Sequence, residues 1–196
     1  MSPVARFRLT GFAIAALVFV VDQYFKWLVN GPLAMRSGDT IELLAIFALT
    51  RTHNYGVSLG MFTATSVEMR WGLVVVTALI AIVVTVWMLR ERHRGDIAAL
   101  ALVLGGAVGN IRDRFRFGYV LDYADLHFGD FRPFLIFNVA DAAITIGVLI
   151  ILARSLFMRE KPRDTHSEDP DRPGEAGSTP DETPKDTGAD QPAETH

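Results

Sequence analysis

Four long apolar runs constrain the fold of this chain more than any other feature. They cover residues 9–28, 71–89, 97–111 and 134–157. A helix rises about 1.5 Å per residue, so runs of about 20 residues can cross a hydrocarbon core of about 30 Å. Only helices and closed barrels satisfy their backbone hydrogen bonds inside a bilayer. The sequence therefore predicts an all-α membrane protein with four transmembrane helices.

The third run is short for a membrane span. Its residues 97–111 would form a helix of about 22 Å. Either the helix continues into residues 112–117, or the bilayer thins at this point. Gly105, Gly106 and Gly109 would let another helix pack closely against this one.

The first run could also belong to a cleaved secretory signal peptide, because Arg6 and Arg8 precede it. It is long for such a peptide, however. Asp22, Gln23 and Lys26 stand where a cleavage site with small residues would be expected. We therefore interpret it as a membrane span.

The placement of arginines gives the orientation. The short link between the second and third runs contains Arg90, Arg92 and Arg94, and basic residues also precede the first run and follow the fourth. Short cytoplasmic loops carry an excess of Lys and Arg. A multi-pass protein with both termini in the cytoplasm is expected.

Residues 160–196 differ in composition from the rest of the chain. They contain six prolines, eleven acidic and four basic residues, and no Leu, Ile, Val, Phe, Trp, Tyr or Met. Such a segment cannot bury enough apolar surface to offset its ordering entropy. We predict a membrane domain over residues 1–159 and a disordered, acidic, Pro-rich cytoplasmic tail over residues 160–196.

About forty residues separate the first two runs. Short apolar stretches at residues 41–47 and 55–62 lie on either side of the turn-prone Asn54, near Gly56. We expect a small β-containing or amphipathic element on the extracytoplasmic membrane face. Thr65 has the spacing of a capping box with Glu68, which predicts where the second helix begins.

Ionisable residues inside a membrane are costly, so each needs a partner or a function. Asp22 and Lys26 are four residues apart on the first predicted helix, and a structural ion pair explains them. Asp141 opens an apolar helix with no base before Arg154. Asp141 must therefore hold a proton or find a partner from another segment.

The loop before the fourth run offers that partner. Asp122 has apolar and aromatic neighbours and is the preferred candidate; Asp113, Asp125 and Asp130 are alternatives in more polar surroundings. Two close carboxylates share one proton, so one can take a proton from water while the other donates one. Such a pair suits amide hydrolysis.

This chemistry needs no metal and no cofactor. The chain has no cysteine, and only His127 of its five histidines lies near these acids in sequence. Zinc sites generally use three or four ligands at close spacing. The glycines of the third run fit helix packing better than phosphate binding. We expect no metal, no cofactor and no nucleic-acid partner.

Four blocks of the sequence, in order, resemble the motifs of the lipoprotein signal peptidase (signal peptidase II) family. They are Asp22-Gln23-x-x-Lys26; Asn54-x-Gly56; Gly105-Gly106-x-x-Gly109-Asn110-x-x-Asp113-Arg114 with Gly118-x-Val120-x-Asp122-Tyr123; and Phe137-Asn138-x-Ala140-Asp141-x-x-Ile144-x-x-Gly147. Each motif alone is weak, but their order and spacing across residues 9–157 are specific. Arg112 departs from the pattern, because an apolar residue is common there.

The resemblance implies an intramembrane aspartyl endopeptidase with Asp122 and Asp141 as catalytic residues. Its substrates would be diacylglyceryl-modified prolipoproteins, cleaved before the lipidated cysteine. It further implies substrate-binding positions at Asn54, Gly56, Asn110, Arg114 and Asn138, and structural positions at Asp22, Lys26 and Asp113. A bacterial cell (inner) membrane location, contact with membrane lipid and a monomeric state are expected.

A proton-coupled carrier or channel subunit is the main alternative, because intramembrane acids and lysines also mark ion pathways. Four spans are few for a carrier, and the sequence shows no inverted repeat.

Overall fold

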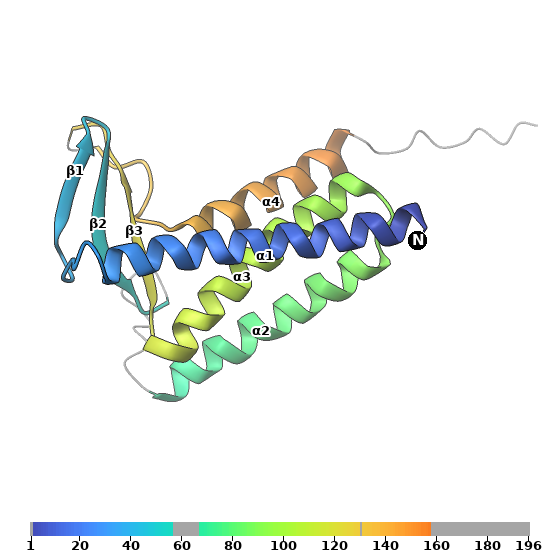
Figure 1. Ribbon diagram of the computed structural model, residues 1–196, viewed down its shortest axis with the longest axis horizontal. Coiled ribbons are helices and arrows are strands. Elements are labelled where there is room, and N and C mark those ends of the chain that lie inside the picture. Colours follow the sequence, from blue (N-terminus) through green and yellow to red (C-terminus); the bar gives the residue numbers. More distant parts are fainter. Residues whose placement is uncertain (1, 57–66, 130, 158–196) are drawn as a thin grey trace, which may run out of the picture. The chain divides into compact units, whose positions relative to one another are not determined.

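Four helices form the framework of the membrane domain. The computed structural model describes residues 2–56, 67–129 and 131–157. Within these residues the helices are α1 (Pro3–Asn30), α2 (Val67–Arg90), α3 (Arg94–Phe117) and α4 (Val139–Phe157). Each is long and apolar enough to cross a membrane, as the four apolar runs predicted. Figure 1 shows a small sheet at the end of the helices where α1 and α3 finish and α4 begins.

Helix α3 continues beyond the short third run, as one of the two sequence interpretations proposed. It ends at Phe117 and is followed by Gly118 in the left-handed conformation, with φ of 86°. Glycine adopts this conformation without the steric cost that a Cβ brings, and it often ends a helix. The 24 residues of α3 span about 36 Å, enough to cross the bilayer.

Helix α4 begins at Val139 and not at Phe134, so the predicted start of the fourth span was wrong by five residues. The backbone N–H and carbonyl groups of Phe137 pair with Ala124 instead, at 3.0 Å and 2.7 Å. A residue whose backbone is bonded to a strand cannot also enter a helix ladder. The helix therefore starts only after this pairing, and Asn138 is the residue immediately before it.

The sheet has three antiparallel strands in the order β1–β2–β3. They are β1 (Thr40–Leu44), β2 (Phe47–Asn54) and β3 (Val120–Leu126). The predicted β-containing element between the first two helices is confirmed, but its third strand comes from the segment between α3 and α4. Asp122 on β3 is the register partner of Thr52 on β2. The sheet thus carries one of the predicted catalytic residues to the start of α4.

Parts of three predictions lie outside the described residues. The second apolar stretch of the first loop, residues 55–62, is described only to Gly56, and Thr65 of the predicted capping box is not described. The same holds for the acidic tail, residues 160–196.

Helix α3 is the central helix and packs against the other three. In its most apolar stretch 56% of the residues are buried, against at most 22% in α1, α2 or α4. Close packing depends on glycines, as predicted. A Cβ at Gly109 of α3 would lie 2.6 Å from Asp22 Oδ2 of α1, and a Cβ at Gly147 of α4 would lie 2.6 Å from the carbonyl oxygen of Ala99 of α3. The helices therefore approach each other more closely than larger residues would allow.

Candidate active site

The predicted catalytic and substrate-binding residues gather at the sheet end of the helices. Asp122 comes from β3 and Asp141 from the first turn of α4. Asn110 and Arg114 project from the last two turns of α3, and Asn54 ends β2. Residues far apart in the sequence are therefore brought together by the packing of α3 against α4 and by the pairing of β2 with β3.

Asn138 links the two aspartates. Its side-chain Oδ1 accepts a hydrogen bond from the backbone N–H of Asp141 at 2.9 Å, and its own N–H donates to Asp141 Oδ2 at 3.4 Å. This reciprocal arrangement is a capping box at the start of α4. Because Oδ1 faces an N–H group, the amide must present its Nδ2 on the other side, where it donates to Asp122 Oδ1 at 2.6 Å.

Asn110 holds Asp141 from the other side in a similar way. Its Nδ2 donates to Asp141 Oδ1 at 2.8 Å, while its Oδ1 accepts from Lys26 Nζ at 3.1 Å. An ammonium group can only donate, so Lys26 fixes which end of the Asn110 amide faces the carboxylate. Asn110 is buried and lines neither of the two cavities described below. The structure therefore places it as a support for Asp141.

Lys26 lies within a buried network of charges. Its Nζ is 2.9 Å from Asp22 Oδ2 and 2.8 Å from Asp113 Oδ2. Asp22 accepts a hydrogen bond from the backbone N–H of Ala140 at 3.0 Å, and Asp113 accepts one from Leu121 at 3.4 Å. One cation thus joins α1 to α3, while its two carboxylates hold the first turn of α4 and the start of β3.

Asp122 is almost fully buried, with 2% of its surface exposed. Desolvation of the carboxylate and the nearby charge of Asp141 raise its pKa from the ordinary 3.8 to about 7, although hydrogen bonds from Asn54 and Asn138 oppose the rise. Burial disfavours the ionised form, and a second acid nearby adds to the effect. Asp122 is therefore suited to hold the proton that two neighbouring carboxylates would share.

Gly56 brings the main chain close to Arg114. Its N–H donates to Asn54 Oδ1 at 2.8 Å, and its φ is +92°. A Cβ at this position would lie 2.6 Å from Leu73 and 3.7 Å from Arg114 Nε. A residue other than glycine would therefore be strained here and would crowd its neighbours.

The guanidinium group of Arg114 interacts favourably with both Asp122 and Asp141. Its Nε is buried and has no hydrogen-bond partner among the described residues. A buried donor without a partner costs free energy unless something binds it. Arg114 therefore has an N–H available for another molecule beside the two acids.

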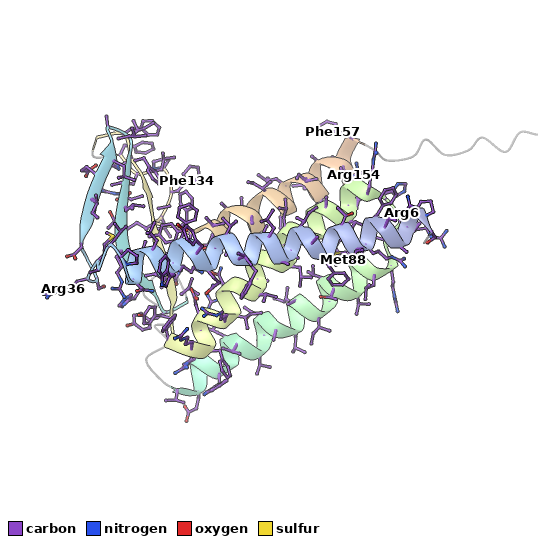
Figure 2. The ribbon with its side chains drawn as sticks, viewed as in Figure 1. Arg6, Arg36, Met88, Phe134, Arg154 and Phe157 are labelled. Carbon is purple, nitrogen blue, oxygen red and sulfur yellow. The ribbon has the colours of Figure 1, made fainter. Side chains whose placement is uncertain are left out.

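Two cavities open on either side of the segment 134–136. The Asp122 cavity has a volume of about 650 Å³ and is lined by residues that include Asn54, Gly56 and Asp122. The Asp141 cavity has a volume of about 300 Å³, and apart from Asp141 and Thr145 its lining is apolar. Phe134, labelled in Figure 2, lines both. Each aspartate therefore faces its own cavity, with Asn138 between them.

An aromatic wall borders the Asp122 cavity. His53 lines it and stacks on Tyr119, with ring centroids 3.9 Å apart. Burial, together with the charge of Arg51, lowers the pKa of His53. His53 therefore contributes a neutral ring to this wall at pH 7.

The alternative acids have other partners or are not described. Asp113 pairs with Lys26, and Asp125 accepts hydrogen bonds from Thr50 at 3.1 Å and from Arg132 Nε at 3.1 Å. Asp130 lies outside the described residues. Among the residues that are described, no three His, Asp or Glu side chains are grouped as a metal site would require.

Sequence reasoning missed two features of the site. It did not identify the strand that carries Asp122, nor the role of Asn138 as the cap of α4. The second had a visible signal, because Asn138 and Asp141 have capping-box spacing just before an apolar run.

Comparison with known proteins extends over most of the described chain. Residues 14–157 match the family model of signal peptidase (SPase) II. The chain is 55% identical over 160 residues to the lipoprotein signal peptidase of Sphingopyxis alaskensis, covering 82% of this chain and 91% of that protein. It is 33% identical over 157 residues to the lipoprotein signal peptidase of Francisella tularensis subsp. novicida, covering 79% and 96%.

Two solved structures of a bacterial membrane enzyme have the same fold. Both align with a TM-score of 0.66, at 26% and 28% sequence identity. The alignments cover 78% and 77% of this chain, and 92% and 94% of those chains. With a family model that covers α2, α3, α4 and most of α1, and with relatives of this similarity, the chain belongs to the signal peptidase II family.

Proposed function

We propose that Asp122 and Asp141 form the catalytic pair with which this chain removes signal peptides from prolipoproteins. The signal peptidase II family consists of aspartic peptidases of bacterial membranes, and its members process prolipoproteins. The observation that carries the assignment is the amide of Asn138, which bonds the Asp122 carboxylate and the Asp141 main chain together. No other described pair of acids on the chain has this connection to the cavities.

The two carboxylates divide the chemistry between them. We assign the shared proton to Asp122, whose pKa is raised to about 7, and the role of general base to Asp141. A water molecule attacks the scissile carbonyl carbon as Asp141 takes one of its protons, and Asp122 donates its proton to the carbonyl oxygen. When the C–N bond breaks, Asp141 gives its proton to the leaving amine, and Asp122 regains a proton from a hydroxyl of the intermediate. Both acids return to their starting states.

Neighbouring donors would hold this geometry during the reaction. Asn110 fixes Asp141 at Oδ1, and Asn138 fixes Asp122 at Oδ1. Oδ2 of Asp141 accepts only the long 3.4 Å bond from the Asn138 N–H, so it would keep a lone pair for the reacting groups. Arg114 can donate its unpartnered Nε–H to a carbonyl oxygen of the substrate main chain. Asn54 and Gly56 would line the path of the peptide through the Asp122 cavity.

The substrate fits the surroundings of the acids. A diacylglyceryl-modified cysteine needs an apolar channel that is open to lipid, and the Asp141 cavity is walled by exposed apolar residues such as Phe134, Leu135 and Ile146. Cleavage on the N-terminal side of that cysteine would place the scissile bond between the two acids.

We further propose that both termini of the chain are cytoplasmic. Figure 2 labels Arg6 and Arg154 at the end of the helices opposite Arg36 and Phe134, and the link containing Arg92 lies at the same end as Arg6. The excess of Arg in the short segments at that end supports a cytoplasmic side. The acidic tail of residues 160–196 would then also be cytoplasmic. Separately, we propose that the chain acts as a monomer.

The experiment that tests the proposal is cleavage of a purified diacylglyceryl-modified prolipoprotein by the full chain in detergent. Asp122→Asn and Asp141→Asn should each remove activity while the protein remains folded. Asp125→Asn is the control for another buried acid and should keep kcat within about threefold of wild type at saturating substrate. If Asp122→Asn or Asp141→Asn cleaved at the wild-type rate, the assignment of the catalytic pair would be wrong.

A further inference from the structure

A third cavity lies between α1 and α3, away from the two aspartates. It has a volume of about 280 Å³, and its lining includes Lys26, Trp27, Asn30, Arg112 and Arg116. None of its lining residues also lines the Asp122 cavity or the Asp141 cavity. This α1–α3 cavity is therefore separate from the proposed catalytic site.

The charges around the α1–α3 cavity leave an excess of positive charge. Lys26 is already balanced by Asp22 and Asp113, at 2.9 Å and 2.8 Å. Arg112 donates to Gln23 Oε1, and its nearest carboxylate oxygen, on Asp113, is 4.0 Å away. Two carboxylates thus face three cations, once Arg116 is included, so a singly charged anion would complete the balance.

Arg116 is the least satisfied of these cations. Its guanidinium carbon lies 5.2 Å from the centroid of the Phe117 ring, and no ion pair or hydrogen bond joins its side chain to the described residues. It is four residues after Arg112, so the two guanidinium groups are neighbours on the same face of α3. Like charges at this spacing destabilise a helix, and an anion between them would remove the repulsion.

The depth of the cavity is that of a lipid headgroup. Asn30 and Phe117 are the last residues of α1 and α3, and the cavity covers the final two turns of both helices. Trp27 has 58% of its surface exposed at this level. Trp and long cationic side chains gather where a membrane span meets the headgroups.

We propose that the α1–α3 cavity binds the phosphate of an anionic phospholipid with a phosphoglycerol headgroup. Two guanidinium groups offer planar pairs of N–H donors that match phosphate oxygens. The side-chain amide of Asn30 can bond the headgroup hydroxyls. The acyl chains would descend along exposed apolar side chains that lie deeper on α1 and α3, such as Val20 and Val108. Basic pockets between membrane helices bind anionic headgroups on the cytoplasmic side of membranes, and we infer that the same chemistry operates at this opposite end of the helices.

The test uses the purified, delipidated full chain in detergent and measures lipid binding by native mass spectrometry. Phosphatidylglycerol and phosphatidylethanolamine with the same acyl chains are compared, and inorganic phosphate is added as a competitor. The variants are Arg116→Ala, Arg112→Ala with Arg116→Ala, and a matched control, Arg90→Ala with Arg92→Ala. The control removes the same charge from exposed residues at the other end of the helices.

Wild type should bind one phosphatidylglycerol about tenfold more tightly than phosphatidylethanolamine. Arg116→Ala should weaken that binding several-fold and the double variant by about tenfold or more, while the control stays within about twofold of wild type. Arg116 makes no polar contact with the described residues, so its variant remains informative if the double variant fails to fold.

Three results would overturn the proposal. Equal binding of the two lipids would show that the charge of the headgroup does not determine binding. Unchanged binding in Arg116→Ala would show that the lipid binds elsewhere. Saturable binding of inorganic phosphate that phosphatidylglycerol does not displace would show a site for free phosphate instead of lipid.

Discussion

Asn110 on α3 donates its side-chain Nδ2 to Oδ1 of Asp141 on α4 across 2.8 Å. Removing this donor by Asn110→Leu should lower kcat about 10- to 100-fold, because hydrogen bonds to charged groups contribute about 1.5–3 kcal/mol. The measurement is the cleavage rate on a lipidated prolipoprotein at saturating substrate, with Tm as the control for folding. An unchanged kcat in a folded variant would show that Asp141 needs no support from α3.

The charge of Lys26 should contribute more to the stability of the fold than to the binding of substrate. Lys26→Met leaves Asp22 and Asp113 buried without their cation. Breaking a buried ion pair by removing one partner costs about 3–5 kcal/mol. Thermal unfolding in detergent should therefore show a large decrease in Tm.

A triple variant is the control for this prediction. Asp22→Asn and Asp113→Asn, combined with Lys26→Met, remove all three charges and should recover a large part of the lost Tm. If the triple variant were less stable than Lys26→Met, hydrogen bonding and not charge would be the main contribution of the network.

The raised pKa of Asp122 predicts a stability that depends on pH. The folded protein binds this proton more tightly than the unfolded chain, whose pKa is near 3.8, so stability falls as the pH rises from about 4 towards 7 and above. Asp122→Asn cannot ionise and should avoid this loss. At pH 8 the variant should unfold several degrees above wild type, and at pH 4 the difference should be much smaller. A difference in Tm that is the same at both pH values would contradict the prediction.

The ion pair between Asp125 and Arg132 should act on the substrate and not on the chemistry. Arg132 lines the Asp122 cavity and is held by Asp125 at 3.1 Å, just before the segment 134–136 that separates the two cavities. Asp125→Asn weakens this hold and should raise KM several-fold while kcat stays within about threefold of wild type. A large fall in kcat with KM unchanged would instead assign Asp125 to the reaction.

Close helix packing can be tested with two glycines. A Cβ at Gly147 would lie 2.6 Å from the carbonyl oxygen of Ala99, whereas a Cβ at Gly72 has open space around it. Gly147→Ala should therefore destabilise the protein by about 1–3 kcal/mol, as overpacked sites do. Gly72→Ala should be neutral or slightly stabilising, because Ala favours helix more than Gly. Equal Tm values for the two variants would mean that α3 and α4 can separate at little cost.

The sequence was most informative where structure depends on local properties. The four spans follow from long apolar runs, and the end of α3 coincides with Gly118, a residue suited to finish a helix. The start of α4 was misplaced because residues 134–137 are as apolar as the helix that follows. Only the pairing of Phe137 with Ala124 excludes them from the helix, and that pairing is made with a strand over ten residues away.

Strand β3 was missed for a similar reason. Its sequence, Val120–Leu126, contains two acids and would be unremarkable without β2 beside it. Strand formation depends on cross-strand neighbours more than on intrinsic preference. The two aspartates could be proposed from their unusual settings and from the resemblance. The orientations of the Asn110 and Asn138 amides could not, since donors on other segments fix them.

The hydrogen bond from the Ala140 N–H on α4 to Asp22 on α1 bears on how the protein is made. The first helix to be synthesised carries Asp22 and Lys26, but it receives Asp113 only with the third helix and Ala140 only with the fourth. A nascent chain with three helices in the bilayer holds its charges only partly bonded and lacks Asp141 altogether. With Asp141 as a member of the proposed catalytic pair, proteolytic competence would arise only in a late step, when the last helix enters the membrane and completes the site.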